Sequence, residues 1–156
     1  TIPVFLDTRK LCVVQNFYPY HYWINNQSIT GKYDERYMDK VRLLAERLLA
    51  ISRDKGVYDF EPQIRNDFLS MTVLTVKNEI YRNYKAGRRT VTRNIRAICE
   101  DPKVREALER HTMDKLSSSI RLYLWLMKKG RYTTCYWLVL IFFKIHYYLG
   151  KEYRRQ

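Results

Sequence analysis

The spacing of apolar residues changes along the chain from a strand-like pattern to repeated helical ones. Residues 17–24 are aromatic and β-branched and contain Pro19, which is typical of a short or edge strand. Residues 25–33 form a polar, turn-prone loop. From Asp34 onward apolar residues recur at intervals of three and four, which predicts helices. The pattern therefore predicts one or two short strands followed by a helical region over 34–156.

The helical region divides into six segments, separated by glycine, proline or acidic capping residues. The expected helices cover residues 34–56, 62–87, 90–99, a segment beginning at Asp101-Pro102, 113–129 and 132–153. We therefore expect a mainly α fold, a bundle of about five to six helices. The side chains expected to face inward are Tyr37, Val41, Leu44, Leu48, Ile51, Ile64, Phe68, Met71, Thr75 or Leu74, Tyr81 to Tyr84, Val91, Ile95, Ile98, Val104, Leu108, Leu116, Ile120, Tyr123, Leu124 and Met127.

Length and composition agree with one helical domain. The chain has 156 residues, of which 46% are hydrophobic, and only five glycines and four prolines, too few turns for a sandwich or barrel. One or two strands are not stable alone. Either the helices cover the predicted strands, or their sheet lies before residue 1.

The chain is strongly basic, with a formal net charge of +13. Residues 113–156 hold nine Lys/Arg and two acids, whereas residues 1–112 hold twenty Lys/Arg and fourteen acids. Such a charge attracts nucleic acid, anionic lipid or phosphorylated substrates, and composition does not choose among them. A soluble surface that is merely basic is the alternative.

Few residues resemble a catalytic or metal centre. The three cysteines are far apart and lack CxxC spacing, which argues against zinc and favours a reducing cytosolic setting. His21, His111 and His146 are isolated. Asp59 and Glu61 have the D-x-E form of a metal dyad, but they precede Pro62 at a helix start, so helix capping is the favoured interpretation. We therefore predict no metal site.

The last segment predicts contact with a membrane surface. Residues 132–143 are uncharged, but these twelve residues are too few to span a bilayer. The predicted surface residues are Lys128, Lys129, Arg131, Trp137, Lys144 and Lys151, and Tyr132, Tyr136, Tyr147, Tyr148 and Tyr153 add further amphipathic rings. The alternative is an ordinary core helix.

A second basic cluster lies on the helix predicted at 90–99. It comprises Arg88, Arg89, Arg93 and Arg96, with Lys103 and Arg105 nearby. Phosphate contacts of a nucleic acid could use these residues. No RNA- or DNA-binding module is recognisable, so nucleic acid is the less favoured partner.

The segment Tyr20–Thr30, YHYWINNQSIT, resembles the end of the catalytic domain in family-2 glycosyltransferases that build bacterial surface polysaccharides. In these enzymes YYYR-I-N-x-x-S-I-T/S closes the catalytic domain, and a basic helical tail follows. Trp23 stands where the family often carries Arg. The resemblance implies an acceptor-side loop that includes His21, Tyr22, Asn26 and Ser28.

The resemblance also implies a GT-A fold that binds a nucleotide-sugar with Mg²⁺ or Mn²⁺. The metal-binding D-x-D and general-base motifs of the family normally precede the segment seen here, and residues 1–10 do not match the latter. We therefore expect a C-terminal part of a longer enzyme, with no cofactor or catalytic residue of its own. Residues 1–33 would end the catalytic domain, and 34–156 would form a helical region at the inner face of the cytoplasmic membrane. The expected partners are the upstream catalytic domain, the anionic membrane and a lipid-linked or saccharide acceptor. Oligomeric state is left open. The alternative is a stand-alone basic helical module that binds nucleic acid or a partner protein.

Overall fold

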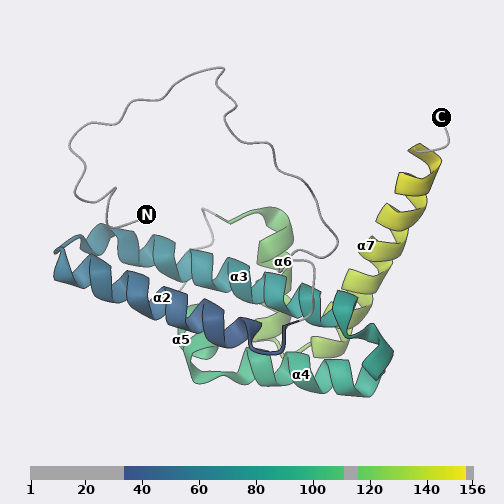
Figure 1. Ribbon diagram of the computed structural model, residues 1–156, viewed down its shortest axis with the longest axis horizontal. Coiled ribbons are helices and arrows are strands. Elements are labelled where there is room, and N and C mark those ends of the chain that lie inside the picture. Colours follow the sequence, from purple (N-terminus) through teal and green to yellow (C-terminus); the bar gives the residue numbers. More distant parts are fainter. Residues whose placement is uncertain (1–33, 111–115, 154–156) are drawn as a thin grey trace.

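The computed structural model describes residues 34–110 and 116–153, with only the backbone path given for Phe143 and residues 146–153. Within these ranges the chain forms six α-helices and two short 3₁₀ turns, and no strand (Figure 1). The predicted helical bundle is therefore confirmed for this part of the chain. The strands predicted before residue 34 lie outside the described residues.

The helices follow one another with short connections. In chain order the elements are α2 (Tyr37–Asp54), η2 (Tyr58–Phe60), α3 (Glu61–Arg82), η3 (Tyr84–Ala86), α4 (Arg88–Glu100), α5 (Pro102–Arg110), α6 (Ser118–Lys128) and α7 (Tyr132–Tyr153). Helices α2 and α3 form a long antiparallel pair, and α4 turns back beneath them (Figure 1). The far end of α7 extends away from the other helices (Figure 1).

Helix α3 is the centre of the bundle, because each of the other five α-helices packs against it. Its fully buried residues include Leu69, Val73, Val76 and Ile80, none of which was among the expected inward residues. A helix covered on several sides buries most of its circumference, so its core residues do not form one stripe. Of the two alternatives at its middle, Thr75 is buried and Leu74 is exposed.

Three residues that were expected to face inward are exposed, namely Leu44, Arg82 and Tyr84. Leu44 is exposed because α2 packs mainly against α3 and buries only a narrow face, to which Met38 and Val41 belong. Tyr84 is exposed because α3 ends at Arg82, and Tyr84 lies in the short 3₁₀ turn that follows.

Glycines end two helices where the sequence predicted. Gly56 and Gly130 have φ angles of 67° and 66°, in the left-handed region that glycine adopts without steric cost.

The start of α6 was predicted too early, because Ser117 is extended and its Oγ accepts a hydrogen bond from the Ile120 N–H at 3.5 Å. A serine in this position is a helix N-cap. Leu116 is nevertheless buried, as expected.

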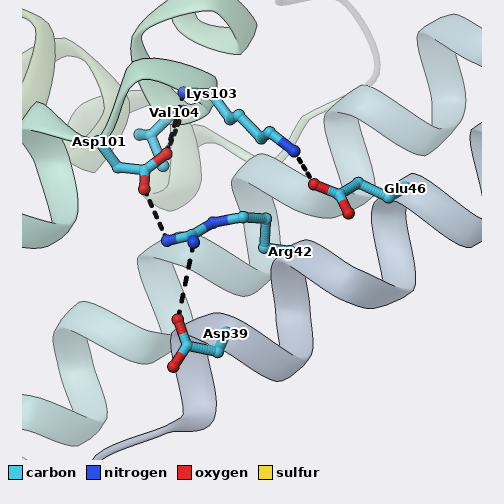
Figure 2. Close-up of polar contacts among 6 residues, drawn as sticks. All are labelled: Asp39, Arg42, Glu46, Asp101, Lys103 and Val104. Atoms are coloured by element: carbon cyan, nitrogen blue, oxygen red, sulfur yellow. Dashed lines mark hydrogen bonds and ion pairs between the residues drawn. The ribbon is translucent and has the colours of Figure 1, made fainter.

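Asp101 joins the α4–α5 corner to α2 (Figure 2). Its Oδ1 accepts hydrogen bonds from the backbone N–H of Lys103 at 2.9 Å and of Val104 at 3.4 Å, which confirms the predicted cap of α5. Its Oδ2 accepts a hydrogen bond from Arg42 Nη2 at 2.6 Å. An ion pair between Lys103 and Glu46 makes a second link between α5 and α2 (Figure 2).

Candidate functional site

The first half of α7 is part of the core. Tyr132, Cys135, Tyr136 and Val139 are buried where α7 packs against α3, α4 and α6. The expectation that the rings of Tyr132 and Tyr136 reach lipid headgroups is therefore wrong, because these rings are enclosed by protein. For these four residues the core-helix interpretation is correct.

Another side of α7 carries large exposed apolar side chains. Trp137, Ile141, Phe142 and Ile145 are each about half exposed, and we call these four residues the apolar face of α7. Trp137, Ile141 and Ile145 are spaced four residues apart and therefore lie on one side of the helix. They belong to α7, whose C-terminal end extends away from the other described helices (Figure 1). Only Trp137 of the four was predicted as a surface-contact residue.

Positively charged side chains flank the apolar face at both ends. Lys128, Lys129 and Arg131 are exposed at the turn between α6 and α7, and Lys144 is exposed beside Ile145. None of these four has a carboxylate partner among the residues that the structure describes. The side chain of Lys151, the remaining predicted cation, lies outside the described residues.

The chain around this surface carries charges of one sign over a long stretch of sequence. The sequence contains no Asp or Glu from residue 115 to residue 151. Helix α6, which packs against α7, adds two exposed apolar residues, Leu122 and Trp125, that sequence reasoning did not single out. Across 34–110 and 116–153, no helix is both long and apolar enough to cross a membrane.

The carboxylates with D-x-E spacing serve the α2–α3 turn. Glu61 Oε1 accepts a hydrogen bond from Arg53 Nε, and its Oε2 from Arg65 Nη2, both at 2.8 Å. The bond from Arg53 holds the pKa of the Glu61 carboxyl below its usual value. The predicted capping by this pair is wrong, because Asp59 is exposed and the start of α3 has no side-chain cap. No group of three metal-ligating side chains occurs in the described part of the chain.

The predicted acceptor-side residues His21, Tyr22, Asn26 and Ser28 lie outside the described residues. The structure therefore brings together the cationic and aromatic surface residues of the C-terminal segment and does not place the acceptor-side residues.

Comparison of the chain with models of protein families, with characterised proteins and with solved structures found no match. The likeness to family-2 glycosyltransferases accordingly depends on the motif at residues 20–30 and on the composition of the C-terminal segment.

Proposed function

We propose that this chain is the C-terminal part of a family-2 glycosyltransferase that transfers a sugar from a nucleotide-sugar to a polysaccharide or lipid-linked acceptor. The resemblance of residues 20–30 to the end of the catalytic domain supports this proposal. In it, an upstream GT-A domain binds the nucleotide-sugar and the Mg²⁺ or Mn²⁺ ion. The loop containing Asn26 and Ser28 contributes to the acceptor side.

In the same proposal, α7 holds the enzyme on the inner face of the cytoplasmic membrane. The observation that carries this part is the exposed apolar face of α7 between unpaired cations. Full burial of one such side chain is worth about 1.5–3 kcal/mol, so covering the exposed half of four residues contributes about 4 kcal/mol. Each lysine or arginine near an anionic surface adds about 1 kcal/mol. These terms are sufficient for peripheral binding that weakens with salt.

The membrane part is tested by co-sedimentation with vesicles of phosphatidylglycerol and phosphatidylcholine at low salt. Phe142→Asp should reduce binding strongly, because it places a negative charge in the apolar face. Phe60→Asp is the matched control: Phe60 is 51% exposed and Phe142 is 52% exposed, but Phe60 lies in the α2–α3 turn, at the opposite end of α3 from α7 (Figure 1). Equal loss of binding in both variants, or no binding by the unmodified chain, would remove this role.

The transferase part is tested in the complete protein that carries this segment. Asn26→Ala or Ser28→Ala should lower sugar transfer more than it lowers thermal stability, because the proposed role is contact with the acceptor. A larger effect on stability than on transfer would assign both residues to turn structure. An upstream coding sequence without a D-x-D motif in an alternating strand-helix region would refute the family assignment itself.

A further inference from the structure

The basic residues predicted on and near α4 do not form one surface. Lys103 is paired with Glu46 of α2, and Arg105 donates a hydrogen bond to Tyr132 Oη at 3.1 Å. The side chains of Arg88, Arg89, Arg93 and Arg96 instead line a cleft of about 640 Å³ against the start of α7. Arg131, from the turn that precedes α7, completes what we call the arginine cleft.

The cleft concentrates positive charge with little compensation. No Asp or Glu is among its lining residues. Arg96 forms an ion pair with Glu100 at 3.3 Å, but the other four arginines have no carboxylate partner within 34–110 and 116–153. By contrast, Arg53, Arg65 and Arg110 on other helices each lie beside a glutamate. Like charges held together without counter-ions favour the binding of an anion.

The start of α7 supplies a second feature that favours an anion. The first backbone hydrogen bond of this 22-residue helix runs from the Cys135 N–H to the Arg131 carbonyl at 3.1 Å. The N–H groups of Tyr132, Thr133 and Thr134 precede it and have no helical acceptor. Arg131, at the cap position, has only donors and cannot satisfy them. The helix therefore presents unpaired N–H groups at the wall of the cleft, where its dipole is positive.

The walls of the cleft add neutral donors in a fixed frame. Thr133 and Thr134 line it, and both are exposed. The ring of Tyr132 is held on one side by the hydrogen bond from Arg105, and Arg96 lies over it at 5.8 Å. Hydroxyls, backbone amides and guanidinium groups are together the donors that bind phosphate oxygens.

We propose that the arginine cleft binds a diphosphate group. Two linked phosphates supply enough negative charge and enough oxygen atoms to bind guanidinium groups on both walls. A carboxylate group carries one negative charge and two oxygen atoms. The volume is also large enough for a group attached to the diphosphate, since binding pockets for small molecules usually have about 300–1,000 Å³. The site is separate from the apolar face of α7 and does not depend on the transferase assignment.

The test is titration calorimetry of the full chain with inorganic pyrophosphate. Saturable binding is expected. Arg89→Gln and Arg131→Gln, one from each wall, should each weaken it about tenfold or more, the loss typical of one charge-assisted hydrogen bond. Arg47→Gln is the matched control, an exposed arginine in the middle of α2 without an ion pair in the described residues; it should change affinity less than about threefold. Phe142→Asp should leave pyrophosphate binding unchanged.

Two further arms distinguish the source of the diphosphate. Displacement of pyrophosphate by a soluble nucleoside diphosphate, with the same sensitivity to Arg89→Gln, would indicate a soluble ligand. Displacement by a short-chain prenyl diphosphate but not by the nucleoside diphosphate would indicate a lipid carrier. The proposal is refuted by absence of saturable binding, by equal effects of Arg131→Gln and Arg47→Gln, or by RNA that binds more tightly and is not displaced by pyrophosphate.

Discussion

Replacing Asp101 with alanine should destabilise the helical region substantially, because this carboxylate makes two kinds of contact at once (Figure 2). One oxygen caps α5, and the other accepts the 2.6 Å hydrogen bond from Arg42. The side chain of Asp101 is only 15% exposed, and that of Arg42 is 34% exposed. The pair is therefore partly shielded from water, and Arg42 Nε is buried without a partner of its own in the described residues.

The magnitude follows from adding the two contacts. Removal of an aspartate N-cap costs about 1 kcal/mol. Loss of the Arg42 partner costs about 1 kcal/mol, at the upper end of the range for exposed pairs. Asp39 does not replace that partner, because it is exposed and its Oδ1 lies 3.7 Å from Arg42 Nη1. Asp101→Ala should therefore lower the free energy of unfolding by about 2 kcal/mol. This corresponds to a decrease in Tm of about 4–8 °C for a chain of this size.

Asparagine separates the two contributions. Asp101→Asn retains an oxygen for the cap, since Asn and Asp are comparable N-caps, and removes only the charge opposite Arg42. It should cost about 1 kcal/mol, half of the alanine effect. Urea denaturation followed by circular dichroism measures both variants, and Arg42→Gln completes a double-mutant cycle. Equal effects of alanine and asparagine would show that the cap contributes nothing, and no effect of either would refute the packing of the α4–α5 corner on α2.

Three other predictions test the fold and its ionisable groups. Leu69→Ala should lower the free energy of unfolding, measured by urea denaturation, by about 2–5 kcal/mol, because Leu69 is 0% exposed in α3. Leu74→Ala is the control and should lower it far less, because Leu74 is 43% exposed. Equal losses would contradict the central position of α3. Glu61→Gln should lower the free energy of unfolding at neutral pH, because folding lowers the pKa of Glu61. The difference in unfolding free energy from the unmodified chain should be complete above pH 4.5 and disappear as the pH falls through the folded-state pKa. A difference that does not depend on pH would contradict the ion pairs of Glu61. Burial raises the pKa of Cys99 to about 12 and of Cys135 to about 11. Both thiols should therefore react slowly with an alkylating reagent at pH 8 in the folded chain and quickly after denaturation, as measured by peptide-resolved mass spectrometry. Fast alkylation of the folded chain would place them at the surface.

Local signals predicted the helix boundaries well where a single residue controls the backbone. Gly56 and Gly130 end helices because their positive φ angles suit glycine, and Asp101 begins one because its carboxylate accepts N–H groups two and three residues later. Ser117 carried a similar signal, but it lies between Leu116 and Ile120, which were both expected on the inward face of one helix. Periodicity alone cannot locate a cap between two apolar residues of matching spacing.

Core membership was harder to predict for helices with unusual numbers of neighbours. Leu69 and Ile80 were missed because α3 is enclosed by five helices and buries several faces. Leu44 was wrongly placed inside because α2 packs mainly against one helix. A periodic pattern indicates which residues share a face, but the number of faces that are covered depends on elements distant in sequence.

The sequence by itself determined that 34–110 and 116–153 would be mainly helical and that the C-terminal segment would be basic and aromatic. It also predicted that the uncharged residues 132–143 are too few to span a membrane. Only the tertiary structure decided which side chains of α7 are buried, such as Cys135 and Val139, and which are exposed, such as Trp137 and Ile141. It also brought Arg131 to the arginines of α4, although 35 residues separate it from Arg96 in the sequence. The physical reason is that local periodicity and caps depend on neighbouring residues, whereas exposure and the grouping of charges depend on which helices pack together.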